Sequence, residues 1–400
     1  MKFLLKQLEK SKHLFEPDGK LDKLYPLYEA NDTFLFTPSD VTDGPSHIRD
    51  SVDMKRTMIT VILALIPCIL FGIWKAGHQY NLVNLVANPT WWTDMMQGAT
   101  IVLPIILVSY AVGGIWEVLF SVIRKHEINE GFLVTGMLFP LTLPPTVPLW
   151  QVAIGISFGV VIGKEIFGGT GFNVLNPALT ARAFLFFAYP VQMSGDNVWT
   201  VVHDKANVME GFTGATPLAI AALSPTGGHV VQTLTEAGFS WKTLALGTLG
   251  GSIGESSFIA CALGALILIL AGIGSWQIML SCVIGLFAGS SVLNWLPADQ
   301  FSGYTQLPFH YHVVMGGFAF GAVYMATDPV SAAATRFGKW IYGFLIGFLV
   351  ILIRVTNPAY PEGVMVAILF MNVMAPLIDH YVLQFHIKQR AAYLRKFSHA

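Results

Sequence analysis

Long apolar segments separated by short polar ones fill the chain after residue 56. A helix needs about 20 mostly apolar residues, roughly 17–25, to cross a bilayer. Seven segments come near that length: 57–75, 99–123, 146–164, 255–275, 276–296, 338–355 and 363–382. Three shorter segments, interrupted by glycine or proline, are 131–145, 178–196 and 312–327. The pattern predicts an all-α polytopic membrane protein with about ten transmembrane helices.

The distribution of basic residues predicts how these helices are oriented. Lys and Arg gather on the cytoplasmic side of membrane proteins. Residues 1–56 form a polar head with nine Lys and Arg, and further basic residues follow the second, fourth, eighth and tenth predicted helices. The segments between them are poorer in basic residues: 76–98, 197–240, 297–311 and 356–362. We therefore expect both termini in the cytoplasm and the 197–240 loop on the outer side.

Composition narrows the class further. Hydrophobic residues make up 54% of the 400 residues and charged residues only 12%, about half the charged fraction of a soluble domain. The net charge of −1 argues against a nucleic-acid partner. Cys68, Cys261 and Cys282 lie in apolar segments without Cys-x-x-Cys spacing, so we expect buried thiols and no metal centre. Without a Walker A lysine loop or an H-E-x-x-H zinc motif, no catalytic residue is expected on this chain.

Two stretches of the chain resemble each other. "GFLVTGMLFPLTLPPTVPLW" at 131–150 leads through an apolar segment to "VLNPAL" at 174–179. "GFAFGAVYMATDPVSAAATRFGKW" at 317–340 leads in the same way to "VTNPAY" at 355–360. The two copies lie five predicted helices apart. Because this number is odd, the second copy has the opposite orientation in the membrane. The pattern predicts two inverted five-helix repeats with broken helices, as in transporters; the alternative is chance similarity of apolar, glycine-rich sequence.

"EIFGGTGFNVLNPALTARAF", residues 165–184, is rich in glycine and asparagine. Irregular backbone at membrane depth persists only where it is buried in protein or lines a cavity. The amides of Asn173 and Asn176 offer donors and acceptors that suit the edge of a heteroaromatic ring. The alternative is a re-entrant turn capped by asparagine.

Acidic residues near the predicted helices are candidate ion ligands, because a carboxylate inside a span is costly and usually functional. In "AVGGIWEVLF", Glu117 follows Gly113 and Gly114 by one turn, and pairing with Arg124 is the alternative. For Glu255 in "GSIGESSF" and Asp328 in "MATDPVSA", helix capping is an equal alternative. Asp379 in "MAPLIDHY" has no local capping role and is the better ion candidate. A crossing cation needs such oxygen ligands.

The stretch "EGFTGATPLA" at 210–219 reads most simply as a loop in which Thr216 caps a helix that starts at Pro217. An acidic residue followed by Thr-Gly-Ala-Thr also resembles the flavinylation motif of bacterial electron-transport membrane proteins. In those proteins a flavin transferase links FMN through its phosphate to the last threonine. The acidic residue is usually Asp, and here it is Glu210.

The resemblance extends over nearly the whole chain. "KEIFGGTGFNVLNPAL", "GGFAFG", "MATDPVSA" and "NPAYPEG" are similar to the NqrB membrane subunits of the sodium-translocating NADH:quinone oxidoreductase, the Nqr complex. The RnfD subunits of the Rnf complex are related, but they lack the long head that here ends in "SHIRDSVDMKR". The head therefore favours the Nqr type.

The resemblance implies two flavins. Covalent FMN falls on Thr216, where the small Gly214 and Ala215 leave room for the modifying enzyme. A noncovalent riboflavin is expected near the cytoplasmic side, and Asn173 and Asn176 are the candidate contacts.

It also implies sites for quinone and sodium. The quinone region falls on Gly113, Gly114 and Glu117. The acids associated with sodium uptake match Glu117, Asp328 and Asp379.

The function implied is that of a translocase subunit in a bacterial inner membrane. It would pass electrons from FMN through riboflavin to ubiquinone and couple this to outward Na⁺ transport. The implied partners are an NADH-oxidising flavoprotein with an iron–sulfur centre, a second subunit with covalent FMN, and the flavin transferase. The alternatives are an Rnf-type subunit, or a small-solute channel or transporter.

We expect the chain to have five parts. They are a basic cytoplasmic segment at 1–56, a first transmembrane repeat at 57–196, a periplasmic loop with the flavinylation motif at 197–240, a second repeat at 241–383 and a cytoplasmic tail at 384–400.

Overall fold

The computed structural model describes residues 2–15, 19, 21, 24–36, 54–86, 88–125, 128, 130–202, 214–227, 229–297, 301–357 and 362–398. Within these ranges the regular structure is helical, apart from one isolated bridge between Thr226 and Ser302. Glu210 of the flavinylation motif and the Pro-Ala of the second Asn-Pro-Ala lie outside the described residues. So does the stretch "SHIRDSVDMKR" up to residue 53.

The helices of the first half are α1 (Lys2–Phe15), α2 (Tyr25–Leu35), α3 (Met54–Val83), α4 (Trp91–Arg124), α5 (Gly131–Leu141), α6 (Leu149–Val161), α7 (Pro177–Ala188) and α8 (Pro190–Met193). Those of the second half are α9 (Pro217–Ala222), α10 (Val230–Glu236), α11 (Trp241–Leu246), α12 (Phe258–Leu270), α13 (Trp276–Asn294), α14 (Phe309–Val314), α15 (Phe318–Phe320), α16 (Arg336–Thr356) and α17 (Val364–Ser398). A π-helical turn, Gly321–Met325, continues α15.

Each of the ten predicted membrane segments falls on helical residues. Six helices in the described part of the chain are long and apolar enough to cross a membrane: α3, α4, Leu149–Phe167, α13, α16 and α17. Three shorter apolar helices are α5, α7 and α12. The fold is therefore that of a multi-pass helical membrane protein.

Two predicted boundaries differ from the observed ones for local reasons. α4 begins at Trp91 rather than 99, because the Thr90 hydroxyl accepts a hydrogen bond from the N–H of Thr93 and caps the helix. α17 continues to Ser398, well beyond 382, through the basic sequence after Phe385. That sequence is polar, which ended the predicted span, but it is rich in good helix formers.

Both copies of the sequence repeat contain a broken helix. α5 contains Pro140 and ends at Leu141, and a segment of turns with Pro144 and Pro148, which lack backbone donors, precedes α6. In the second copy α15 and its π-helical turn end before Asp328-Pro329, and α16 follows after another irregular stretch. The two copies thus share the order of short helix, break and longer helix.

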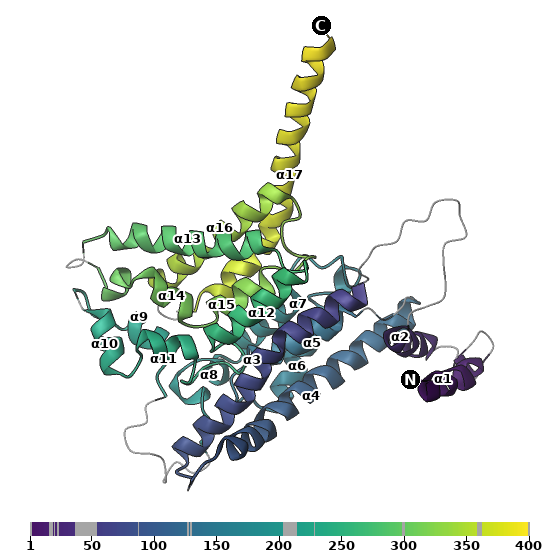
Figure 1. Ribbon diagram of the computed structural model, residues 1–400, viewed down its shortest axis with the longest axis horizontal. Coiled ribbons are helices and arrows are strands. Elements are labelled where there is room, and N and C mark those ends of the chain that lie inside the picture. The colour runs from purple at the N-terminus through teal and green to yellow at the C-terminus, as the bar shows by residue number, and fades with distance from the viewer. Residues whose placement is uncertain are drawn as a thin grey trace.

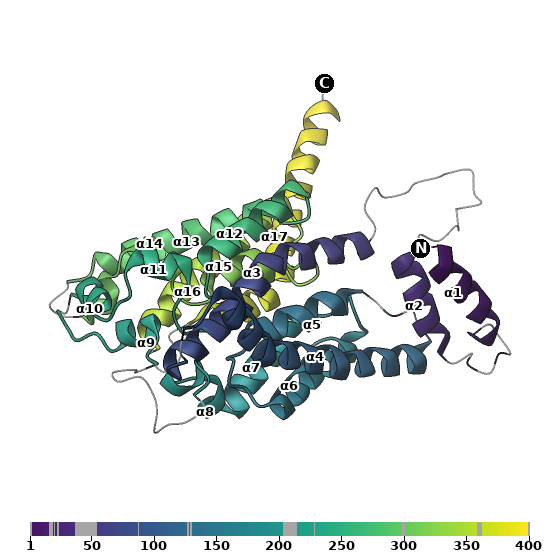
Figure 2. The same cartoon turned by 60° about the horizontal axis from the view of Figure 1, so that its bottom comes forward.

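Two buried apolar clusters organise the molecule. The larger cluster joins the long helices and contains the buried thiols of Cys68, Cys261 and Cys282, as the pattern predicts. The smaller cluster joins α9, α10, α11 and α14 with Tyr304 and Leu307. In both ribbon views α9, α10 and α11 lie at one end of the molecule and α1 and α2 at the opposite end, while α17 projects away from the other helices (Figures 1 and 2).

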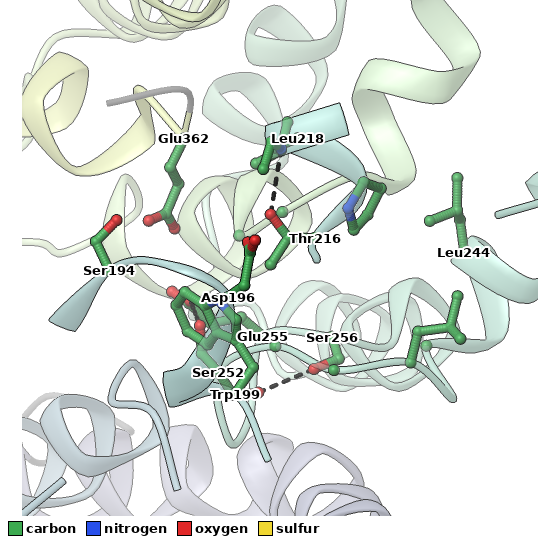
Figure 3. A pocket seen from close by; sticks show the side chains of 18 of the residues that line it. Ser194, Asp196, Trp199, Thr216, Leu218, Leu244, Ser252, Glu255, Ser256 and Glu362 are labelled. Carbon is green, nitrogen blue, oxygen red and sulfur yellow. Dashed lines mark hydrogen bonds between the residues drawn. The ribbon is translucent and has the colours of Figure 1, made fainter. Parts of the chain in front are cut away.

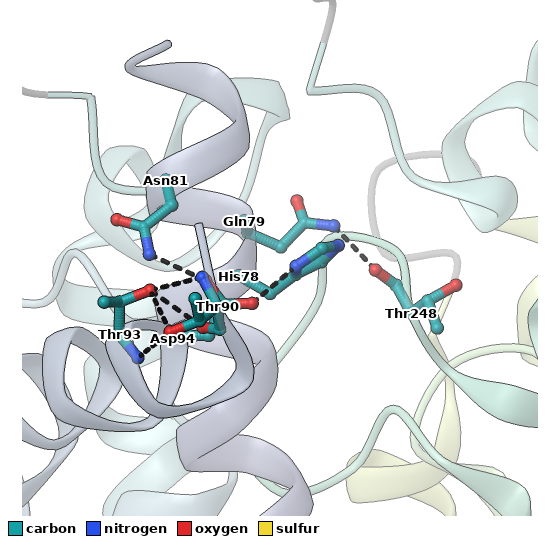
Figure 4. Close-up of polar contacts among 7 residues, drawn as sticks. All are labelled: His78, Gln79, Asn81, Thr90, Thr93, Asp94 and Thr248. Carbon is teal, nitrogen blue, oxygen red and sulfur yellow. Dashed lines mark hydrogen bonds and ion pairs between the residues drawn. The ribbon is translucent and has the colours of Figure 1, made fainter. Parts of the chain in front are cut away.

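The end of the α3–α4 hairpin is held by close backbone contact and a polar cluster. A Cβ on Gly77 would lie 1.8 Å from a backbone oxygen of α4, and one on Gly98 would lie 1.7 Å from a backbone oxygen of α3. Beside this crossing the buried Asp94 carboxylate contacts His78 Nδ1 at 2.8 Å and accepts from Asn81 Nδ2 at 2.7 Å (Figure 4). Only glycine permits the crossing, and the carboxylate then fixes its register.

Candidate functional site

Thr216 begins α9, as predicted. Its hydroxyl accepts a hydrogen bond from the N–H of Ala219 at 3.2 Å, and Pro217 follows as the first helical residue. Gly214 has a φ of +63°, in the left-handed region that favours glycine. The capping interpretation is therefore confirmed, and Thr216 is also half-buried against a cavity.

This space, which we call the Thr216 cavity, has a volume of about 280 Å³. Thr216, Asp196, Trp199 and Glu255 face it from three segments of the chain, with Asp196 and Trp199 in the same short turn (Figure 3). Its volume lies near the lower limit of ligand pockets, about 300–1,000 Å³. Its apolar and aromatic walls with a few polar groups are typical of a site for a flat organic ligand.

Three charged side chains line the polar side of the Thr216 cavity, and the sequence pattern does not predict that they lie there. Arg182 from α7, Glu255 and Glu362 all line it. The Glu255 carboxylate accepts from the Ser252 hydroxyl at 2.5 Å. The hydroxyl of Ser257, and not Glu255, caps α12, so the capping alternative for Glu255 is wrong.

Lys75 of α3 holds the loop that carries Glu255. Its side chain is only 2% exposed. The ammonium donates to the carbonyls of Gly251 and Ser252, at 3.1 and 2.8 Å, and to the Ser256 hydroxyl. Lys75 lies at the end of one predicted span and Arg182 inside another. A charged residue within an apolar segment is costly and usually functional, so the sequence could have singled out both positions.

A second space, the Asn173 cavity, lies between the broken helices. Asn173, Asn176, Lys164 and Asp328 line it, so the structure brings together residues predicted from different motifs. The Asn176 side-chain oxygen accepts from two N–H groups at the start of α7, at 3.0 and 3.2 Å, which is the capped turn of the alternative interpretation. Asn176 therefore both caps α7 and lines the cavity.

The Asn173 cavity has a volume of about 80 Å³. That is well below the range of about 300–1,000 Å³ for organic ligands. In the arrangement described, its residues do not accommodate a tricyclic flavin ring.

Glu117 forms a buried ion pair with Lys164, and the two residues are 4% and 3% exposed. Lys164 also lies 3.5 Å from the carboxylate of Glu165. Arg124 contacts Glu165 at 3.2 Å and not Glu117, so the predicted alternative pairing is replaced by a four-residue network. Lys164 connects this network to the Asn173 cavity, which it lines.

The two glycines before Glu117 differ in their surroundings. A Cβ on Gly113 would lie 2.4 Å from the ring of Phe132 on α5, so Gly113 is a helix-packing position. A Cβ on Gly114 would meet its nearest atom only at 3.9 Å. Of the pair, Gly114 is the one with space beside it.

Asp379 holds the residues at the start of α16 from a distant part of the chain. Its carboxylate accepts from the N–H groups of Ala334 and Thr335, at 2.7 and 3.0 Å, and from the Thr335 hydroxyl. Thr335 itself caps α16, because its hydroxyl accepts from the Gly338 N–H at 3.1 Å, and Asp379 holds this cap in place from 44 residues away. Asp328 accepts from the Val330 N–H at 3.2 Å and the Ser331 hydroxyl at 2.6 Å while lining the Asn173 cavity.

Long apolar helices, broken helices and cavities between them define a polytopic membrane protein whose internal spaces can hold ligands. Residues 41–388 match the family described as the NQR2, RnfD, RnfE family. The chain belongs to that family.

Relatives match the chain over almost its full length. The B subunit of the Na(+)-translocating NADH-quinone reductase of Stutzerimonas stutzeri (strain A1501) is 51% identical, over 96% of this chain and 98% of the relative. The proteins of the same name from Pseudomonas aeruginosa (strain LESB58) and Yersinia pestis are 50% and 49% identical with the same coverage.

Proposed function

We propose that the chain is the membrane subunit of a sodium-translocating NADH:quinone oxidoreductase that carries FMN on Thr216. Relatives with this subunit's name share about half of their residues with it over 96% of the chain. The observation that carries the flavin assignment is the position of the Thr216 hydroxyl on the wall of a cavity of about 280 Å³.

The proposed topology has ten crossings in two inverted repeats, with both termini in the cytoplasm. It is supported by the repeated order of short helix, break and longer helix. It is also supported by the placement of α1 and α2 at the end opposite α9, which begins after Thr216 (Figure 1). Thr216 then lies on the periplasmic side, and the five-part division of the chain follows.

The residues around Thr216 fit an attached FMN. The hydroxyl is the group that would form the phosphoester, and Gly214 and Ala215 add no bulk beside it. FMN supplies one- and two-electron transfer, while the protein positions and tunes it. Trp199 and Leu218 on the cavity wall would hold its ring and exclude water.

The remaining sites are assigned by position. Quinone reduction is proposed beside Gly114 and Glu117, and cation uptake through the Asn173 cavity with Asp328 as a direct ligand. Glu117 is proposed to act beside that route through its ion pair with Lys164, and Asp379 through its contacts at the start of α16.

Riboflavin is proposed to contact Asn173 and Asn176, as the resemblance implies; the Asn173 cavity as described is too small to enclose its ring. The flavin content of the complex is the direct test. Asn173→Ala should lower the noncovalent flavin of the complex and leave the covalent flavin unchanged. Unchanged noncovalent flavin would contradict this assignment.

The function is tested on the complex in sealed vesicles with NADH and ubiquinone. We expect quinone reduction that rises with Na⁺, accompanied by Na⁺ transport, and loss of both in Thr216→Ala. Electron transfer from ferredoxin without quinone reduction would favour the Rnf-type alternative. Solute flux by a colourless protein would favour the channel.

A further inference from the structure

Arg182 is a buried cation with an unused donor. Its side chain is 5% exposed, and Nε donates to the carbonyl of Thr142 at 3.1 Å. Nη2 reaches the carbonyl of Met193 at 3.5 Å, and the ring of Phe186 lies 5.9 Å from the guanidinium carbon. Nη1 is buried and has no hydrogen-bond partner among the described residues. Leaving a buried donor unpaired is costly, more so for a charged group.

Arg182 lies at the inner end of the Thr216 cavity. Arg182, Glu255 and Glu362 also line a much smaller space of about 10 Å³, whose other walls are residues of the helical core such as Gly321 and Met365. Thr216 does not line that second space. The three charged residues therefore separate the Thr216 cavity from the interior of the helices, and the cavity extends from Thr216 toward Arg182.

The charges at this end are closely grouped. A Cβ on Gly317 would lie 2.8 Å from a carboxylate oxygen of Glu362 and 2.9 Å from one of Glu255. Two carboxylates thus approach one point beside the guanidinium, and neither makes a hydrogen bond to Nη1. A ligand that places an anionic acceptor at the end of the cavity would complete the coordination of Arg182.

We propose that Arg182 Nη1 binds the pyrimidine edge of the flavin ring attached at Thr216 and stabilises its reduced form. This inference rests on the proposed covalent FMN. On full reduction the ring gains two electrons and one proton, so one negative charge remains on that edge. A guanidinium there favours the reduced flavin, and the neighbouring carboxylates of Glu255 and Glu362 oppose it.

The test is a redox titration of the covalent flavin in the isolated complex, with the Thr216→Ala complex subtracted to remove the other flavins. Arg182→Gln should favour the oxidised flavin about tenfold, which is about 30 mV lower for a two-electron couple. Arg182→Lys should shift the potential less, because the charge remains. Glu255→Gln should shift it in the opposite direction. The exposed Arg336→Gln is the matched control and should leave it unchanged.

Opposite shifts for Arg182→Gln and Glu255→Gln support the proposal, since a general loss of packing would not reverse its sign. The proposal is overturned if the covalent flavin has the same potential in the Arg182→Gln complex and in the unsubstituted complex. Nη1 would then be satisfied by water or by the FMN phosphate. If the Arg182→Gln complex does not assemble, the flavin potentials of the Arg182→Lys and Glu255→Gln complexes are compared instead. Opposite shifts again support the proposal, and unchanged potentials overturn it. An unchanged complex without covalent flavin would instead refute the proposed function.

Discussion

Lys164 and Glu117 form an ion pair in which both side chains are almost completely buried. Removing one partner of such a pair leaves the other charge without compensation in a medium of low dielectric. The pair joins the proposed quinone region on α4 to the Asn173 cavity.

Lys164→Ala should therefore destabilise the protein strongly, by about 3–5 kcal/mol. Thermal unfolding in detergent measures this, with the exposed Lys242→Ala as the control. The double variant Glu117→Gln/Lys164→Ala should lose less than the sum of the two single variants. Additive losses would show that the two side chains do not interact.

The two glycines of "AVGGIW" form a matched pair of sites. Ala at either position gains the same helix propensity over Gly, but only at 113 would the new methyl group overlap the Phe132 ring. Gly113→Ala should lower the free energy of unfolding by about 1–3 kcal/mol through overpacking. Displacement of Phe132 toward the quinone region should also raise the KM for ubiquinone. Gly114→Ala should raise the free energy of unfolding by up to about 1 kcal/mol, because the helix gains propensity and the new methyl group meets no close neighbour. Equal stability of the two variants would contradict the packing observed.

Asp379 stabilises the start of α16. Asp379→Asn should lower stability by about 1–2 kcal/mol, since the charge that complements the helix dipole is lost. The proposed part in cation uptake predicts in addition that more Na⁺ is needed for half-maximal quinone reduction. The two readouts are separate: an unchanged Na⁺ requirement with lowered stability would restrict Asp379 to its structural role at the start of α16.

The sequence predicted what depends on local pattern. Apolar length located the six helices that are long enough to cross a membrane, and Thr216-Pro217 predicted the cap of α9. It did not predict contacts between residues far apart in the chain. The bond from Asp379 to Thr335 and the approach of Arg182 to the Thr216 cavity depend on how the helices pack. A short pattern carries no information about that packing, so buried charges inside apolar segments were the only available signal.

The most direct test of the central claim is the mass of the peptide that contains Thr216, from the full chain coexpressed with its flavin transferase. We predict a mass increase equal to FMN minus one water, located on Thr216. The increase should persist in the control Thr226→Ala, an exposed threonine near the same end of the molecule, and disappear in Thr216→Ala. An unmodified Thr216 in a transferase-competent cell would contradict the claim and leave the residue as a helix cap.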